Sequence, residues 1–361
     1  MLKVLLVSDS LGSGGAQRQM VSLGIGLKEK GIDVSFLVYH NLNFFKDDLI
    51  TNDIPVFYIN EQNKLKRVLK LRKFIRSGDF DVVQSFLEPV NFACTLASFP
   101  TRNWKLIVGE RSADPKILKS FKRKAFRWFH LMADYVVSNS HENIKILKRV
   151  SPFLSSKKCK VIYNIIDFRL WKAEKDFQFM QNGVVNIAVA ASHQYLKNSI
   201  GLIKALNKLN PNELSMLKIN WYGDESSDSS LKDAKELVRK SNLDNVIVFH
   251  NATKQIHHRM ADVDVVALFS LYEGLPNAIC EGMSLGKVVM SSSVSDVPLL
   301  LGKSKYLLFD PSEILEIVKV LKILTKMSKE EMSTLGHNNY NKAKDLFDKE
   351  TNINKYLKLY K

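Results

Sequence analysis

The chain has 361 residues, of which 45% are hydrophobic and 25% are charged, a composition typical of soluble globular proteins. That length can hold two ordinary α/β domains, each with its own core. No apolar run approaches the roughly 18 residues that a membrane-spanning helix requires, so no such helix is expected.

The net charge of +16 favours a polyanionic partner, which could be nucleic acid, an anionic membrane face or a phosphorylated substrate. The lysines are scattered through amphipathic segments, without a basic tail or a nucleic-acid module. We therefore favour a membrane surface over nucleic acid. Three widely spaced cysteines, Cys94, Cys159 and Cys280, form no metal-like pattern and favour a reducing cytoplasm.

The first predicted elements are a strand over residues 3–8, a glycine-rich loop, a helix over 16–30 and a strand over 33–39. This order opens a doubly wound α/β fold. The loop is not a dinucleotide fingerprint, because the third glycine and the acidic end of the second strand are both missing. Gly14 and Gly15 would let a ligand approach the backbone, although a tight turn alone explains them equally well.

Further strands alternate with helical patterns along both halves, so the sequence predicts two parallel sheets. These strands lie at residues 55–59, 82–85, 105–109, 135–138 and 160–163, and then at 185–190, 219–224, 246–249, 265–270, 288–291 and 306–309. We place a first domain at residues 1–168, a second at 169–338 and a C-terminal helix at 339–361.

Two stretches of the first half combine Lys and Arg with large apolar residues. For residues 65–76 we favour a helix with core-facing apolar residues and a solvated basic face. The second stretch runs from residue 116 to 128. Shallow contact with anionic lipid and a solvated helix face explain it about equally well. If this stretch contacts lipid, the contacts are expected from Lys122, Arg123, Lys124 and Arg127.

The most informative stretch is residues 271–283, Leu-Tyr-Glu-Gly-Leu-Pro-Asn-Ala-Ile-Cys-Glu-Gly-Met. A buried strand is predicted before it, and Pro276 predicts that a helix starts there. Ligands of open α/β sheets bind outside the carboxyl ends of strands, where a helix N-terminus attracts phosphate. Glu273 and Glu281 would repel phosphate, and they suit the hydroxyl groups of a ribose and a sugar ring. The alternative is one capping and one solvated glutamate.

This spacing, with the Gly-Leu-Pro-Asn between the two glutamates and the Gly-Lys-Val-Val after them, resembles the donor-site signature of family 4 retaining glycosyltransferases. The resemblance implies the GT-B fold, in which two Rossmann-like doubly wound domains face each other across a cleft. It also implies retention of anomeric configuration without an enzyme nucleophile. Residues 14–18, Gly-Gly-Ala-Gln-Arg, resemble the family's first loop, which faces the donor diphosphate. A last helix over residues 338–361 is expected to pack back on the first domain.

The donor site implied by the resemblance has Glu273 and Lys197 as its catalytic residues. Lys197 matches the family's phosphate-binding lysine, whereas Ser192 stands where an arginine is common. Glu281 is expected to bind the ribose and Glu273 the transferred sugar. The full set of expected donor-binding residues is Gly14, Gly15, Lys197, Glu273, Gly274, Leu275, Pro276, Asn277 and Glu281.

Two further motifs resemble one subgroup of the family. Residues 85–87, Ser-Phe-Leu, replace a histidine found in many members, and residues 109–115 resemble Ser-Glu-Arg-Asn-Asp-Pro. Both motifs resemble those of enzymes that add amino sugars or hexoses to polyprenyl-diphosphate-linked glycans. Glu110 and Arg111 are then expected on the acceptor side. Arg111 suits a diphosphate, although an ion pair with a nearby carboxylate is an equally good role for it.

Two Asp-x-Asp pairs, at residues 79–81 and 262–264, resemble a metal-binding motif. Both precede their strands, at the end where a doubly wound sheet does not bind ligands, so turn and capping roles are favoured. We expect no metal site, no cofactor besides the substrate nucleotide sugar, and metal-independent transfer.

The sequence thus predicts a glycosyltransferase that moves a hexose or N-acetylhexosamine from a nucleotide diphosphate donor, usually UDP-linked in this family, to a lipid-linked glycan. The implied setting is bacterial O-antigen or capsule synthesis, in the cytoplasm and peripherally on the inner face of the cytoplasmic membrane, with no nucleic-acid partner. One alternative is a nucleotide-sugar epimerase or sugar phosphorylase on the same fold. Another is a non-catalytic module that binds membrane or nucleic acid, although retention of Glu273, Glu281 and Lys197 argues against lost catalysis.

Overall fold

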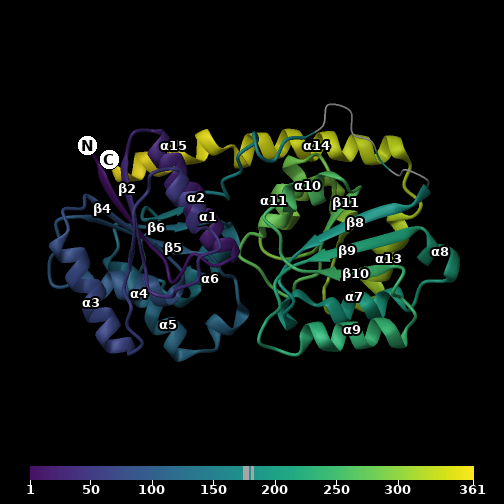
Figure 1. Cartoon of the computed structure of the whole chain (residues 1–361), viewed down its shortest axis with the longest axis horizontal. Coiled ribbons are helices and arrows are strands. Elements are labelled where there is room, and N and C mark those ends of the chain that lie inside the picture. Colours follow the sequence, from purple (N-terminus) through teal and green to yellow (C-terminus); the bar gives the residue numbers. More distant parts are fainter. Residues whose placement is uncertain (174–178, 180–182) are drawn as a thin grey trace. The chain divides into compact units, whose positions relative to one another are not determined.

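The computed structural model describes residues 1–173, 179 and 183–361, and it divides the chain into two compact units (Figure 1). Unit 1 comprises Met1–Ile165 and Lys349–Lys361, and unit 2 comprises Ile166–Asp348. The units therefore divide after residues 165 and 348, compared with the expected 168 and 338. In each unit helices flank a parallel sheet, which confirms the predicted α/β class and the two Rossmann-like domains.

Unit 1 is built on seven parallel strands in the order β3-β2-β1-β4-β5-β6-β7. Successive strand residues face opposite sides of a sheet. Val4 and Leu6 of β1 accordingly join one hydrophobic core, while Leu5 and Val7 join a second core on the other face. The elements are β1 (Lys3–Val7), α1 (Gly15–Glu29), β2 (Asp33–Val38), α2 (Lys46–Thr51), β3 (Val56–Tyr58), α3 (Lys64–Ser77), β4 (Val82–Phe86), α4 (Glu88–Ala97), β5 (Lys105–Glu110), η1 (Pro115–Leu118), α5 (Phe121–Trp128), η2 (Phe129–Met132), β6 (Tyr135–Ser138), α6 (His141–Val150), β7 (Cys159–Val161) and α15 (Lys349–Tyr360).

Unit 2 is built on six parallel strands in the order β10-β9-β8-β11-β12-β13. Its core contains Trp221 and Phe269, whose ring centroids are 6.3 Å apart. The elements are β8 (Val185–Ala190), η4 (Tyr195–Lys197), α7 (Ser199–Leu206), α8 (Pro211–Ser215), β9 (Leu217–Tyr222), α9 (Ser230–Lys240), β10 (Ile247–His250), α10 (Ile256–Ala261), β11 (Val265–Leu268), α11 (Asn277–Ser284), β12 (Val288–Ser292), α12 (Val297–Leu301), η5 (Gly302–Leu307), β13 (Leu308–Phe309), α13 (Ile314–Leu324) and α14 (Lys329–Phe347).

The C-terminal segment is two helices, so the expectation of one helix over residues 338–361 is wrong. α14 ends at Phe347, and Asp348 adopts extended dihedral angles with ψ of 130°. The reason is local pairing: Asp348 forms a β-bridge with Ile166, whose amide donates to the Phe347 carbonyl oxygen at 2.9 Å. α15 then contributes Ile353 and Tyr356 to the core of unit 1.

In both units the sheet order reverses beside the first strand, between β1 and β4 in unit 1 and between β8 and β11 in unit 2. Such a reversal opens a crevice at the carboxyl ends of the strands, where ligands of doubly wound folds bind. The loops after β4, β8 and β11 are therefore the places where the fold provides room for a site.

Candidate functional site

The loops that follow β8 and β11 lie against each other in unit 2. Because these strands are parallel neighbours, their carboxyl ends meet at one edge of the sheet. The Leu271 amide donates to the Leu196 carbonyl oxygen at 2.9 Å and ties the two loops together. Lys197 Nζ lies 2.5 Å from Glu273 Oε1. The two residues predicted to be catalytic therefore form an ion pair.

The backbone around Lys197 is held in one conformation. Lys197 ends the single turn η4, and the next residue, Asn198, has a φ of +59°, which asparagine adopts more readily than most residues. The Asn198 side chain donates to the Pro311 carbonyl oxygen at 2.8 Å. The Lys197 and Glu273 side chains are only 16% and 15% exposed, so their attraction is stronger than that of a pair on the open surface.

Helix α11 starts directly after the loop that carries Glu273. Pro276 is its N-cap and Asn277 its first residue, so the predicted helix start is correct to within one residue. A Cβ at Gly282 would lie 2.7 Å from Cβ of Val266 on β11, so glycine is required for this close packing. Glu281 precedes that glycine and is 1% exposed. One continuous segment therefore leads from the Lys197–Glu273 pair into α11.

His193 holds the loop after β8 in place. It is 4% exposed, and its Nε2 lies 3.0 Å from the His250 carbonyl oxygen. Its amide donates to the Asp224 carbonyl oxygen at 2.8 Å. Burial lowers the pKa of His193, so its ring is neutral at pH 7. This histidine does not supply the positive charge that an arginine at position 192 would carry.

Gly14 and Gly15 lie in unit 1, at the exposed start of α1. A Cβ at Gly14 would lie 2.3 Å from Oε1 of Gln17, and Gln17 Nε2 donates to Asp9 Oδ1 at 2.8 Å. A side chain at position 14 would therefore displace the Gln17 side chain from its place over the loop. The same packing leaves the backbone of both glycines exposed beyond the end of β1.

Glu110, predicted on the acceptor side, is buried in a network of charges and lines a cavity of unit 1. Its Oε2 accepts from Arg127 Nη2 at 3.0 Å, and its Oε1 lies 2.7 Å from His130 Nε2. Burial acts to raise the pKa of Glu110, but the charge of Arg127 and the hydrogen bonds with His130 and Arg127 outweigh it and the pKa is lowered. Both carboxylate oxygens are engaged inside the protein, so Glu110 holds Arg127 in position.

Arg123 and Arg127, one turn apart on α5, both bind Glu88. Glu88 Oε2 accepts from Arg123 Nε at 3.2 Å and from Arg127 Nη1 at 2.5 Å, and Arg123 also pairs with Asp114. Arg127 is only 2% exposed. These two arginines therefore belong to an internal network. The hypothesis that they contact lipid, made for residues 116–128, is wrong for Arg123 and Arg127.

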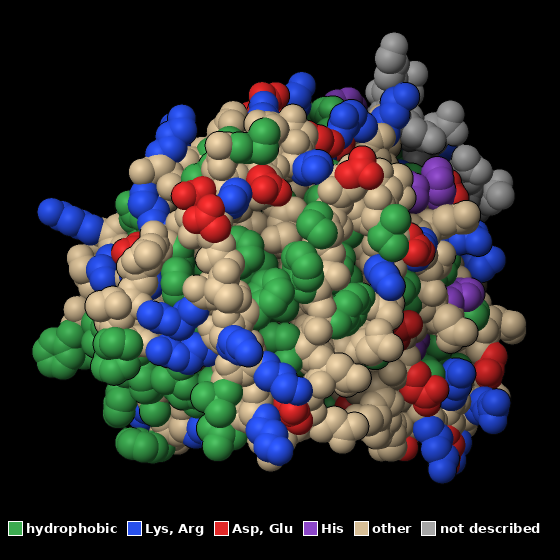
Figure 2. Space-filling model, turned by 60° about the vertical axis from the view of Figure 1, so that its left-hand side comes forward, with side chains coloured by type: hydrophobic (Ala, Val, Ile, Leu, Met, Phe, Trp, Pro, Cys, Tyr) green, Lys and Arg blue, Asp and Glu red, His purple; other side chains and the backbone are tan. Residues whose placement is uncertain are grey.

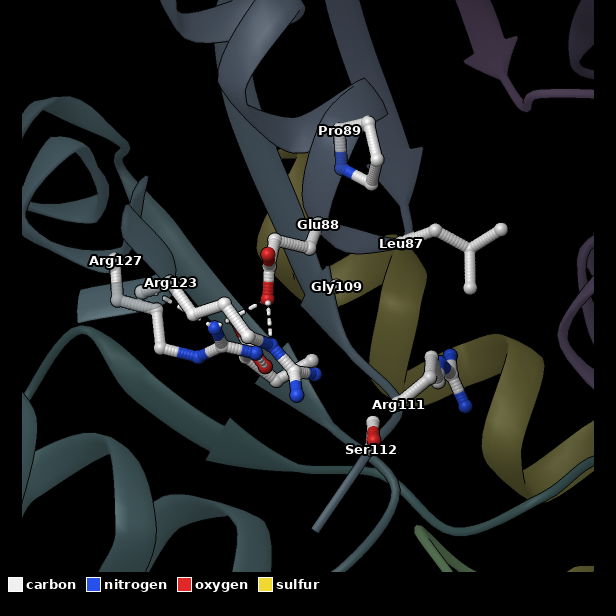
Figure 3. A pocket seen from close by; sticks show the side chains of 9 residues that line it. Leu87, Glu88, Pro89, Gly109, Arg111, Ser112, Arg123 and Arg127 are labelled. Atoms are coloured by element: carbon white, nitrogen blue, oxygen red, sulfur yellow. Dashed lines mark hydrogen bonds and ion pairs between the residues drawn. The ribbon is translucent and has the colours of Figure 1, made fainter. Parts of the chain in front are cut away.

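A cavity of about 320 Å³ opens beside this network, with Leu87, Glu88 and Arg111 among its lining (Figure 3). The guanidinium of Arg111 lies 3.8 Å from the ring centroid of Phe86, and its Nη2 donates to the hydroxyl of Tyr356 at 2.8 Å. Within the described residues Arg111 has no carboxylate partner. Of the two roles predicted for Arg111, the structure excludes the ion pair.

Sequence reasoning missed Glu88 and the inward position of the two arginines. One sequence signal predicts part of this arrangement. Residues four apart on a helix share a face, so Arg123 and Arg127 are expected to point in the same direction. Their common carboxylate partner comes from another helix, 35 residues before Arg123 and 39 before Arg127. No local pattern joins the two segments.

The two Asp-x-Asp pairs lie at the amino ends of the sheets, as predicted. Asp81 Oδ2 accepts from the Lys3 amide at 2.7 Å, and Asp79 forms an ion pair with the Lys3 side chain. Asp264 Oδ2 accepts from the Asn186 amide at 2.7 Å. Across the part of the chain that the structure describes, no three His, Cys, Asp or Glu residues gather closely enough to hold a metal ion.

The surface around α5 combines positive charge with exposed aromatic residues. Residues 115–160 contain twelve Lys and Arg but only two Asp and Glu. Phe121, Trp128 and Phe153 are 73%, 44% and 90% exposed. The Trp128 indole donates to the Val150 carbonyl oxygen at 2.9 Å and so joins α5 to the end of α6, three residues before Phe153. Figure 2 shows a face of unit 1 on which apolar side chains lie among Lys and Arg.

Helix α3 is amphipathic only in part. Leu71 and Ile75 are buried as predicted, but Leu65 and Leu69 are 71% and 57% exposed. Among the described helices, none is both long enough and apolar enough to cross a bilayer.

Comparisons with known proteins agree with the two-unit division. Residues 13–170 match the family model described as Glycosyltransferase Family 4, and residues 184–326 match the model described as Glycosyl transferases group 1. The first match falls mostly in unit 1 and the second entirely in unit 2.

Two relatives come from Campylobacter jejuni. One is the α-1,4-N-acetyl-D-galactosaminyltransferase of GalNAc-α-(1→4)-GalNAc-α-(1→3)-diNAcBac-PP-undecaprenol. It is 25% identical over 308 residues, which are 81% of this chain and 80% of the relative. The other, the 4-α-N-acetylgalactosaminyltransferase of N-acetylgalactosamine-N,N'-diacetylbacillosaminyl-diphospho-undecaprenol, is 24% identical and covers 80% of each chain. Among solved structures, HepE of Anabaena in complex with UDP-glucose superposes with a TM-score of 0.84 at 19% identity, over 99% of this chain and 100% of that one.

The charge network of unit 1 leads to a stability prediction for Glu110→Gln. Removing one partner of a buried ion pair costs about 3 kcal/mol, so the free energy of unfolding should fall by about that amount at pH 7. Because the pKa of Glu110 is lowered in the folded chain, its contribution is complete above the unfolded value of about 4.3 and is lost as the pH falls through the folded value.

Urea unfolding at a series of pH values measures this effect. Glu142→Gln is the matched control, since Glu142 pairs with Lys145 on the surface and should change stability by less than about 1 kcal/mol. Equal effects of the two substitutions at pH 7 would contradict the structural role given to Glu110.

Proposed function

The chain belongs to the family 4 glycosyltransferases of the GT-B fold, and on that premise we propose that it transfers a sugar from a UDP-linked donor to a lipid-linked glycan. The observation that carries this proposal is the Lys197–Glu273 pair, which lies beside α11 at the carboxyl ends of β8 and β11. A cation, a carboxylate and a helix N-terminus at one sheet edge are the groups that a sugar diphosphate requires.

In the free protein Lys197 and Glu273 neutralise each other. On donor binding, Lys197 turns to the diphosphate, whose charge is greater than that of one carboxylate. Glu273 is then released to accept hydrogen bonds from hydroxyl groups of the transferred sugar. Glu281 binds the ribose hydroxyls. Gly274, Leu275 and Asn277 orient the sugar through the backbone.

The transfer proceeds with retention and without a metal ion. The acceptor hydroxyl attacks the anomeric carbon from the face that the diphosphate leaves, its oxygen bonds to that carbon, and the carbon–phosphate oxygen bond breaks. The hydroxyl proton passes to the departing phosphate oxygen. Lys197 and the amide groups at the start of α11 stabilise the negative charge that develops on the diphosphate.

The acceptor is a glycan linked through a diphosphate to a polyprenol. Two features support this choice. The Campylobacter relatives act on undecaprenyl-diphosphate-linked glycans by their names, and Arg111 presents a guanidinium without a carboxylate partner among the described residues. A guanidinium that is held in place but not neutralised suits a phosphate group. The product contributes to a bacterial surface polysaccharide such as O-antigen or capsule.

A lipid-linked acceptor requires the enzyme to reach a membrane surface. The surface around α5 is suited to this role, because Lys119, Lys122 and Lys124 accompany the exposed rings of Phe121 and Phe153. Basic residues attract anionic headgroups, and aromatic side chains enter the interface. The protein is thus peripheral on the anionic inner face of the membrane.

Lys197→Met should weaken UDP binding about tenfold to a hundredfold, as expected when a hydrogen bond to a charged group is lost. Glu281→Gln should weaken it by a similar factor and should have no such effect on inorganic diphosphate. Isothermal titration measures both affinities. Lys218→Met, an exposed lysine of the same unit, serves as control, and unchanged UDP affinity in both site variants would rule out this donor site.

The triple variant Lys119→Glu, Lys122→Glu, Lys124→Glu should lose co-sedimentation with vesicles of phosphatidylglycerol and phosphatidylcholine. Each lysine near an anionic surface contributes about 1 kcal/mol, so reversing three should reduce binding more than a hundredfold. The control reverses Lys204, Lys208 and Lys218 of unit 2, which are exposed. If the two triple variants sediment alike, the membrane surface is not the one around α5.

A further inference from the structure

We propose that the cavity beside Glu88 is the binding site for a sugar ring of the acceptor, with Glu88 accepting a hydrogen bond from one of its hydroxyl groups. This inference rests on the proposed function and names the part of the acceptor that unit 1 holds. Glu88 did not emerge from the sequence motifs, and it is distinct from the donor residues of unit 2.

Glu88 presents one engaged and one available oxygen. Arg123 Nε and Arg127 Nη1 both donate to Oε2, at 3.2 Å and 2.5 Å. Oε1 has no partner among the described residues, and the side chain is 18% exposed where it lines the cavity. Figure 3 shows the Glu88 carboxylate joined to Arg123 and Arg127, with Leu87 and Arg111 drawn to the right of them. A carboxylate oxygen accepts hydrogen bonds, so Oε1 can accept one from a sugar hydroxyl in the cavity.

The carboxylate is held rigidly by a second layer of charges. Arg127 is fixed by Glu110, Glu110 by His130, and Arg123 by Asp114. Buried ion pairs of this kind contribute little net stability compared with apolar packing of the same volume. Their value lies in holding a group in one geometry, which a binding site requires. The network therefore supports Glu88 as a preorganised ligand group.

The backbone before Glu88 is strained. Leu87 has a φ of +76° and a ψ of 142°, a conformation that a leucine rarely adopts. Strain of this kind persists where the surrounding structure enforces it, and it concentrates at functional sites. Here it turns the chain from β4 into α4, so that Glu88 becomes the first residue of α4 and Leu87 an apolar wall of the cavity.

The position of the cavity in the fold agrees with a ligand site. Glu88 follows β4, the strand at which the order of the unit 1 sheet reverses, and ligands of doubly wound sheets bind at that point. Arg111 lines the same cavity, and its Nε is buried without a hydrogen-bond partner. The cavity thus offers an acceptor for a hydroxyl and a donor for a phosphate, the two groups that meet where a glycan joins a diphosphate.

The cavity is tested with octyl-diphosphate-linked N-acetylgalactosamine, a probe that combines both chemistries. Binding to the full chain in the presence of UDP is measured by NMR. Glu88→Gln keeps the size of the side chain, and it should weaken probe binding at least tenfold while UDP affinity stays within twofold of wild type. Glu142→Gln, outside the cavity, should change neither.

Deoxy analogues of the probe separate a direct contact from a structural effect. Removing the hydroxyl that Glu88 binds should cost the wild type about tenfold and cost Glu88→Gln nothing, whereas a merely structural role leaves every analogue equally affected in both proteins. Normal UDP binding with equal probe affinity in wild type and Glu88→Gln, or no probe binding by the wild type, overturns the proposal. Loss of UDP binding by the wild type would instead overturn the donor site in unit 2.

Discussion

The Lys197–Glu273 contact is the interaction on which the account of this enzyme depends. Two opposite charges, each about 15% exposed, are held together where the loops after β8 and β11 meet. Because these strands pair in parallel, the loops after them lie at the same edge of the sheet. The hydrogen bond from the Leu271 amide to the Leu196 carbonyl oxygen joins the two loops. In the function proposed here, a diphosphate at this edge would meet a cation already in position, and its binding would free a carboxylate for the sugar. The free protein thus keeps both groups ordered without leaving either charge unpaired.

Unit 1 also holds charged side chains in fixed positions, but it does so through a larger network. Its charges form a chain in which each group is held by the next, from His130 through Glu110 and Arg127 to Glu88. Only the last member has an oxygen without a partner among the described residues. Arg111 stands apart, stacked on Phe86 and bonded to a tyrosine hydroxyl. In both units, therefore, the groups offered to a ligand lie at the carboxyl ends of strands, where the sheet order reverses.

Much of the fold could be predicted because buried parallel strands appear in the sequence as short apolar runs between turn signals. All thirteen predicted strands are present. The sequence predicted one long C-terminal helix and missed its break. The break arises because Asp348 pairs with Ile166, and a contact across more than 180 residues leaves no local signal. The Lys197–Glu273 contact follows from the motif and the strand order together. The burial of Glu110 and the partly exposed position of Glu88 could not be predicted, because Arg127, which contacts both, lies 17 and 39 residues further along the chain.

A crystal structure of the chain with UDP tests the central claim most directly. The account predicts that Lys197 Nζ leaves Glu273 and lies within hydrogen-bonding distance of a phosphate oxygen, with the ribose hydroxyls at Glu281 and the diphosphate at the start of α11. If UDP binds elsewhere while the Lys197–Glu273 pair remains intact, this pair is a structural ion pair and the donor site proposed here is wrong.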